Sequence, residues 1–138
     1  MDARIRALSI DPSMLRGLSQ RLIDSHHGNN YGGAVKRLNA IRAQLAATAF
    51  ASAPGFQLKG LKREELIATN SMLLHELYFA NLGGDGSTME AAWQLALDAN
   101  FGSVERWREE FVSMGKALAG GSGWMLLVFQ PREGTLVN

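Results

Sequence analysis

Apolar residues recur at helical spacing in the first third of the chain. The first set is Leu15, Leu18 and Leu22, and the second is Val35, Leu38, Ile41 and Leu45. Asp11 before Pro12 predicts a helix start, because aspartate suits the N-cap and proline the first turn. Residues 28–33 lie between the two sets, contain three glycines and favour a helix poorly. The pattern predicts one long helix weakened in its middle, or two helices with a break. Close approach of a neighbouring backbone would explain the glycines.

A second long helix is predicted from about Lys62 to Leu82. The apolar residues that we expect it to bury are Leu66, Ile67, Leu73, Leu74, Leu77 and Tyr78. Residues 83–86 contain three glycines and are expected to end this helix, since glycine accepts the left-handed conformation at a helix C-terminus. Two long helices joined by a loop at residues 53–60 predict an antiparallel hairpin.

Two shorter helices are predicted farther along. Ser87 with Glu90 forms a capping box for a helix that continues through Leu97. Ser103 is a second N-cap, and the helix after it carries Trp107, Phe111, Met114 and Leu118.

The end of the chain has the pattern of a small antiparallel sheet. The apolar run 124–129 predicts a buried strand, residues 131–134 a turn, and residues 135–137 a second strand. The expected fold class is therefore α+β, with a helical hairpin domain at 1–86 and the start of an α/β domain at 87–138. Because a lone two-stranded hairpin is marginal in water, we expect the chain to be truncated within a larger sheet.

Composition narrows the candidate functions. The chain has 138 residues, 46% of them hydrophobic, and a formal net charge of +1, which argues against a disordered chain and against a dedicated nucleic-acid binder. It has no cysteine, so any metal ion must be held by His, Asp or Glu. The apolar run 124–129 is too short to span a bilayer, and the N-terminus lacks a secretory signal. We therefore expect a cytoplasmic protein with no nucleic-acid or membrane partner.

Histidines are the best candidates for chemistry. His26 continues the leucine face of the first predicted helix, and His75 lies among apolar residues in the second. On two antiparallel helices these side chains would converge on one metal ion; the simpler alternative is one core histidine and one surface histidine. His27 is expected to face solvent. Core packing is the simplest explanation of the aromatic residues.

Three segments resemble characteristic motifs of one family, in order and over nearly the whole chain. They are residues 25–31 followed by Leu38-Asn39 (family HxGKHHxxY with Leu-Asn), residues 70–82 (NHxFYW), and residues 101–103 with Phe111 and 121–128 (FGS…F…GSGWxWLV). The family is that of the iron/manganese superoxide dismutases. The resemblance implies an oxidoreductase that disproportionates superoxide to dioxygen and hydrogen peroxide.

The resemblance also implies a site with one iron or manganese ion, three histidines and one aspartate. His26 and His75 match two of these ligands, and the other two belong to a later DxWEHAYY motif that the 138 residues do not contain. Tyr78 and Trp124 match residues that surround the metal ligands in the family. A homodimer or homotetramer is implied as well. With half of the ligand set absent, this chain alone is expected to be inactive.

Some positions depart from the family pattern. Asn30 stands where the family usually has histidine. Ala34 stands where the family has a substrate-gating tyrosine. Tyr31 is nearby in the sequence, but on a regular helix it points away from the direction of Ala34. Ser71 stands where some members have a glutamine that hydrogen-bonds the metal-bound water, and Phe79 replaces a tryptophan. Tyr31 and Ser71 are therefore candidate substitutes for the gate and the water partner. The alternative function is a non-catalytic structural or assembly subunit with the same fold.

Overall fold

The computed structural model describes residues 2–86, 88–118 and 120–138. The chain divides into two compact units, Met1–Gly84 and Asp85–Asn138. Both predicted histidine ligands belong to the first unit. No helix among the described residues is long and apolar enough to cross a membrane.

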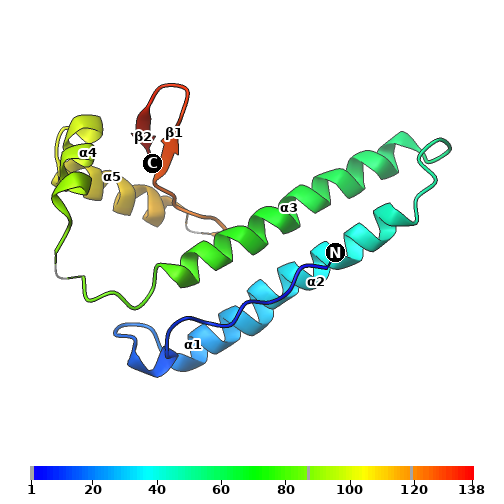
Figure 1. Cartoon of the computed structure of the whole chain (residues 1–138), viewed down its shortest axis with the longest axis horizontal. Coiled ribbons are helices and arrows are strands. Elements are labelled where there is room, and N and C mark those ends of the chain that lie inside the picture. The colour runs from blue at the N-terminus through cyan, green and yellow to red at the C-terminus, as the bar shows by residue number, and fades with distance from the viewer. Residues whose placement is uncertain (1, 87, 119) are drawn as a thin grey trace. The chain divides into compact units, whose positions relative to one another are not determined.

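The first unit is an antiparallel helical hairpin (Figure 1). Its first arm is one continuous helical run made of α1 (Gln20–Ser25), the π-helical segment η2 (His26–Tyr31) and α2 (Gly32–Ala46). The second arm is α3 (Gly55–Ala80). Of the two predicted alternatives, the single helix weakened in its middle is therefore correct. The weak middle is the π-helical segment, where the N–H of Gly32 donates to the carbonyl of His27, five residues back.

The first helix begins later than predicted. The Asp11 side chain caps only the short 3-10 helix η1 (Pro12–Met14), and Ser19 is the N-cap of α1, where its Oγ accepts the Leu22 N–H. Gly17 has a φ of 83°, which a right-handed helix does not accommodate, so the leucine pattern spans a loop. Leu22 is 51% exposed, and the buried face starts at Ile23 instead.

The core between the two arms is built on a narrow stripe of each helix. The buried residues form two clusters. The first contains Ile23, Tyr31, Val35 and Phe79, and the second contains Leu38, Ile41 and Ala68. These include the predicted Val35, Leu38 and Ile41, whereas Leu45 is half-buried. The pattern of the first arm thus predicts its packed face from residue 35 onward.

The predicted core face of α3 is wrong for four of its six residues. Leu66, Ile67, Leu73 and Leu77 are exposed, and Leu74 and Tyr78 are half-buried. The helix packs instead through Ala68, His75 and Phe79, which follow each other at seven and four residues. α3 carries two apolar stripes, and the smaller side chain of Ala68 lets α2 approach on the second one.

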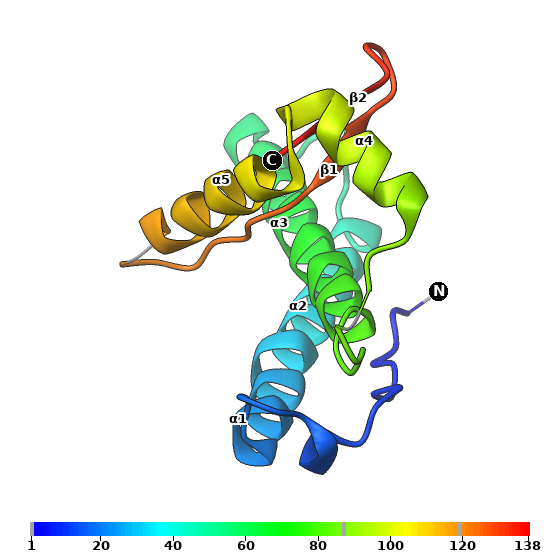
Figure 2. The ribbon, with the colours of Figure 1, turned by 90° about the vertical axis from the view of Figure 1, so that its left-hand side faces the viewer.

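An N-terminal segment, residues 2–10, lies extended along one side of the hairpin (Figures 1 and 2). Asn39 holds it at both backbone groups of Ala3: its Oδ1 accepts the Ala3 N–H at 2.9 Å, and its Nδ2 donates to the Ala3 carbonyl at 2.9 Å. A Cβ on Gly32 would lie 3.3 Å from the Ile5 side chain, whereas Gly28 and Gly33 have no such neighbour. The expected close backbone approach to these glycines is therefore wrong, because a side chain approaches one of them.

We expect Gly83→Ala to destabilise the first unit. Gly83 has a φ of 90°, and a Cβ there would lie 2.7 Å from Cγ2 of Ile10. Left-handed strain and this overlap together should lower the free energy of unfolding by about 2 kcal/mol, measured by urea denaturation. Gly84→Ala is the matched control, since it meets neither obstacle. Equal stability of the two variants would contradict the prediction.

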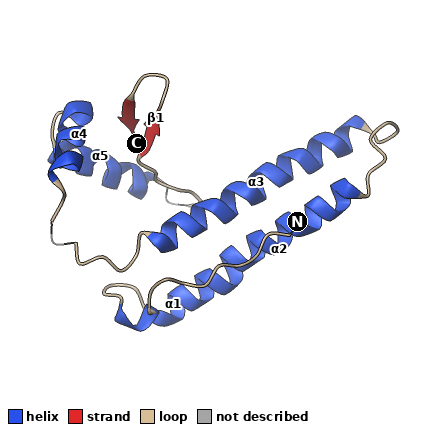
Figure 3. Cartoon of the chain, in the orientation of Figure 1, coloured by secondary structure: helices blue, strands red, loops and turns tan. Residues whose placement is uncertain are grey.

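The second unit combines two helices with a two-stranded antiparallel sheet (Figure 3). The helices are α4 (Ala91–Phe101) and α5 (Val104–Ala117), and the strands are β1 (Val128–Gln130) and β2 (Thr135–Val137). Ser103 caps α5 as predicted, its Oγ accepting the Arg106 N–H at 3.1 Å. The predicted cap at Ser87 lies outside the described residues. In the sheet, Phe129 pairs with Leu136.

The first strand is shorter and more exposed than predicted. Of the apolar run, only Val128 and Phe129 pair with another strand, together with the following Gln130, and all three residues are exposed. Among the residues that the structure describes, β1 pairs with β2 alone, and a strand in such a small sheet buries little. The turn and the second strand are confirmed: the Gly134 N–H donates to the Gln130 carbonyl at 2.9 Å, and β2 begins directly after it.

Candidate metal centre

Two histidines from different arms of the hairpin lie side by side. His26 is the first residue of η2 and His75 lies in the last third of α3, and their ring centroids are 5.0 Å apart at an interplanar angle of 81°. His75 is 6% exposed and His26 is half-buried. The two residues selected from the sequence as a metal pair are therefore brought together.

The orientation of His75 is set by its own helix. Its Nδ1 lies 2.6 Å from the carbonyl oxygen of Ser71 and 3.4 Å from the Ser71 Oγ. Because a carbonyl only accepts, Nδ1 carries the proton and Nε2 carries the lone pair of the neutral ring. A backbone carbonyl on one ring nitrogen is the usual arrangement when the other binds a metal ion. Ser71 thus lies on the Nδ1 side, and its role toward a metal-bound water stays a prediction.

The pKa of His26 also suits a metal ligand. Burial, and next the neighbouring His75, lower the pKa of His26 below its usual value. A lowered pKa favours the neutral ring at neutral pH, and only a neutral imidazole nitrogen binds metal.

Tyr31 reaches the pair because η2 is a π-helix. On a regular α-helix, residues five apart point in different directions, but the wider turn of η2 brings His26 and Tyr31 to the same side. The Tyr31 ring is 1% exposed and stacks on His75 with centroids 6.2 Å apart. Its hydroxyl accepts the Arg6 N–H at 2.9 Å and donates to Oε1 of Glu76 at 2.8 Å. Burial chiefly raises the pKa of Tyr31, so the hydroxyl stays protonated and remains a donor.

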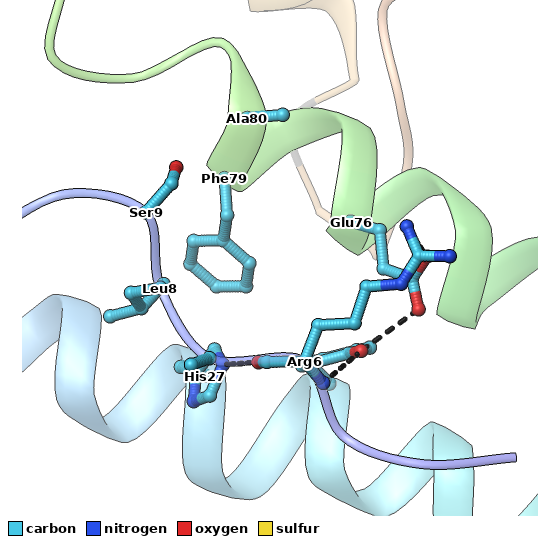
Figure 4. A pocket seen from close by; sticks show the side chains of 9 residues that line it. Arg6, Leu8, Ser9, His27, Glu76, Phe79 and Ala80 are labelled. Carbon is cyan, nitrogen blue, oxygen red and sulfur yellow. Dashed lines mark hydrogen bonds and ion pairs between the residues drawn. The ribbon is translucent and has the colours of Figure 1, made fainter.

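His27 faces solvent only in part, so it is less exposed than expected. It is half-buried, and its Nε2 donates to the carbonyl of Arg6 at 2.8 Å. Its ring lies 5.2 Å from that of Tyr31 and 5.3 Å from that of Phe79. These residues line a pocket of about 180 Å³ beside the histidine pair, which the N-terminal segment borders on its other side (Figure 4).

Two aromatic rings lie next to His26. The ring centroids of Tyr78 and Phe79 lie 5.3 and 5.4 Å from it. Phe79 therefore lines the site where the family motif has a tryptophan. Trp124 belongs to the second unit and is half-buried there, so its role at the metal stays a prediction.

The sequence pattern does not indicate two polar residues of this region, Arg6 and Glu76. Arg6 lies in a segment where polar and apolar residues alternate from Asp2 to Ala7, which is typical of an extended chain but does not indicate what the segment contacts. Glu76 directly follows His75 in a helix where charged residues are ordinarily solvent-exposed, yet only 12% of its side chain is exposed. The one sequence signal for Glu76 was a charged residue with Leu74 and Leu77 close by in the chain.

A second hollow of about 240 Å³ lies on the Ser71 side of the site. Its lining includes Asn30, Ala34 and Arg37 of the first arm and Ala68 of the second. The departures from the family pattern at positions 30 and 34 therefore border this hollow, which the small side chain of Ala34 leaves open.

The donors fit an iron or manganese ion in kind, because neutral imidazole nitrogens bind both. They do not complete a coordination shell. Within residues 2–86, 88–118 and 120–138, no group of three or more His, Cys, Asp or Glu converges. The donors that the described residues bring together are the two imidazoles of His26 and His75.

Comparisons with known proteins agree with the motifs. Residues 89–138 match the family model of iron/manganese superoxide dismutases, C-terminal domain. The chain is 61% identical over 134 residues to an iron superoxide dismutase of Cupriavidus metallidurans, covering 97% of this chain and 68% of the relative. An iron superoxide dismutase of Aquifex pyrophilus is 30% identical, with 93% of this chain and 62% of the relative covered. A manganese superoxide dismutase of Haloferax volcanii is 32% identical, and the match covers 88% of this chain and 59% of the relative. The chain therefore spans about 60–70% of these relatives.

Proposed function

Because the chain belongs to the iron/manganese superoxide dismutase family, we propose that His26 and His75 are two ligands of an iron or manganese ion in a superoxide dismutase. The observation that carries the proposal is the 5.0 Å approach of the two rings, with Nδ1 of His75 bonded to Ser71. Relatives named as iron enzymes and as manganese enzymes both match, so they support either metal.

A bound ion would supply the one-electron chemistry, in which one superoxide is oxidised to dioxygen and a second is reduced, with two protons, to hydrogen peroxide. The residues of this chain would bind the ion and shield it from water. His26 and His75 present neutral nitrogens, Ser71 fixes the ring of His75, and Tyr78 and Phe79 limit the access of water to His26. Limiting water access strengthens the electrostatic interactions that tune a metal ion.

For the 138-residue chain alone, we expect little metal and little activity. Two neutral imidazoles leave an ion under-coordinated and supply no negative charge, so we expect less than about 0.1 ion per chain after dialysis against a chelator. Elemental analysis by mass spectrometry and a superoxide assay measure both quantities. Tight stoichiometric binding of iron or manganese would contradict this expectation.

The decisive experiment uses the polypeptide encoded by the whole gene. We expect one iron or manganese ion per subunit and superoxide dismutase activity, with an Asp-x-x-x-His sequence encoded after codon 138. A correctly folded polypeptide without metal would overturn the proposal. The family resemblance also supports a homodimer or homotetramer in the cytoplasm, which sedimentation equilibrium and cell fractionation test.

The competing function is a non-catalytic structural or assembly subunit. Asn30 and Ala34 favour it, because the resemblance implies a histidine and a gating tyrosine at these positions, and a hollow lies there instead. A stop codon directly after codon 138, or no Asp-x-x-x-His beyond it, would support this alternative.

A further inference from the structure

One carboxylate beside the histidine pair holds two partners at once. Glu76 directly follows His75 on α3. Its Oε1 accepts the hydroxyl proton of Tyr31 at 2.8 Å, and its Oε2 lies 3.1 Å from Nη1 of Arg6. Such charge-assisted bonds are stronger than neutral ones, and here the carboxylate side chain is mostly buried.

The first partner, Tyr31, connects Glu76 to the proposed ligand. Its ring stacks on His75, and its hydroxyl has Glu76 as acceptor and the Arg6 N–H as donor. Both bonding directions of the hydroxyl are thus used within the protein, and the side chain is buried. This arrangement fits a fixed support for the His75 ring better than a mobile gate.

The second partner belongs to the N-terminal segment, residues 2–10, which forms no helix or strand until η1. Side chains of the hairpin bind its backbone at four groups: the N–H and carbonyl of Ala3 through Asn39, and the N–H and carbonyl of Arg6 through Tyr31 and His27. Without these partners the backbone groups would return to water, so the four bonds determine where the segment lies.

We propose that Glu76 is a positioning residue of the histidine site: its carboxylate fixes the Tyr31 ring against His75 and the N-terminal segment over the adjoining pocket. The network joins the second arm of the hairpin, the π-helical turn of the first arm and the N-terminal segment (Figure 4). The proposal rests on the proposed function, since it assigns His75 a ligand's role. Its contacts are nevertheless testable in the metal-free chain.

Trypsin cleavage of the metal-free full chain after Arg4 and Arg6 reports the release of the N-terminal segment. We expect Glu76→Ala to be cleaved there about tenfold faster than the wild type, and Tyr31→Phe also faster, because each loses a bond that holds Arg6. Cleavage tracks the population of the released segment when opening is fast, and tenfold corresponds to about 1.4 kcal/mol. Glu76→Gln retains an acceptor for Tyr31 and should recover most of the protection.

The matched control is Glu65→Gln. Glu65 lies on the same helix and forms ion pairs with Arg42 and Lys62, far along α3 from His75. We expect wild-type cleavage after Arg4 and Arg6 in this variant, because neither partner touches the N-terminal segment.

The position of the His75 ring is read by its proton chemical shifts in the same metal-free chain. We expect Glu76→Ala to shift them, because the Tyr31 ring above His75 moves, and Glu76→Gln to restore them toward wild type. The change in the His75 shifts in the double variant Glu76→Ala/Tyr31→Phe should be only slightly larger than in either single variant, since both substitutions break the same network.

Unchanged cleavage and unchanged His75 shifts in Glu76→Ala would overturn the proposal. So would a lower melting temperature with wild-type His75 shifts, which indicates stability alone. If Glu76→Ala does not fold, Tyr31→Phe decides by the same criteria. Failure of the proposed function is seen separately, as wild-type protein that lacks metal and activity while its network responds as expected.

Discussion

Replacing His75 with alanine is expected to abolish metal loading of the polypeptide encoded by the whole gene. His75 is the more deeply buried of the paired histidines, and Ser71 holds its Nδ1, which leaves Nε2 as the nitrogen with a lone pair for the proposed metal ion. Changes to residues that only support a ligand already cost 10- to 100-fold in metal affinity, so loss of the ligand itself should cost about 100-fold or more. Metal content per folded chain, measured by mass spectrometry, checks the result, and His26→Ala should behave alike.

The matched control is His27→Gln. His27 is the neighbour of His26 in the same π-helical turn, but its Nε2 already donates to the Arg6 carbonyl. Glutamine retains an N–H donor for that carbonyl, so we expect a full metal complement. A folded His75→Ala variant that still binds its ion would show that the ligand assignment is wrong.

The second large effect is expected in the core. Leu38 is fully buried between the arms of the hairpin, in a cluster with Ile41 and Ala68. Leu38→Ala removes its apolar contacts and leaves a cavity, which should lower the free energy of unfolding by about 2–5 kcal/mol. Chemical denaturation measures the difference.

Leu66→Ala is the control for this substitution. It makes the same chemical change on α3, where the side chain is 61% exposed, so we expect an effect within about 0.5 kcal/mol. Similar losses from Leu38→Ala and Leu66→Ala would mean that the packed faces of the hairpin are assigned incorrectly.

Helical periodicity predicted the buried face correctly on the arm of the hairpin that carries a single apolar stripe. Val35, Leu38 and Ile41 are buried as expected. On α3 the same reasoning failed, because two stripes compete and the larger side chains of Leu66, Leu73 and Leu77 dominate the pattern. Which stripe packs depends on how closely a partner helix approaches, and that is a tertiary property.

The pairing of the two histidines could be predicted from the sequence, but the residues that hold their surroundings in place could not. His26 and His75 are the right residue type at matching places on two antiparallel helices, and the motifs single them out. Arg6 is different, because it belongs to a segment whose place depends on side chains far along the chain, such as Asn39. Such bonds between residues far apart in the chain cannot be predicted from the local sequence.

The leucine face that first suggested His26 was itself misleading. Leu15 and Leu18 precede the helix, separated from it by the turn at Gly17. His26 lies beside His75 for another reason: it follows the buried Ile23 by one turn. The pairing of the two histidines was thus predicted from a leucine face that the structure does not contain.

The π-helical turn has a consequence for recognising helical sites in related sequences. A single residue inserted or deleted near position 29 changes which later side chains face the histidine pair, while the helix remains continuous. Motif searches that require spacings of three, four or seven pass over a tyrosine five positions after a histidine. A helical motif search that is meant to find such a pair therefore has to allow a spacing of five residues.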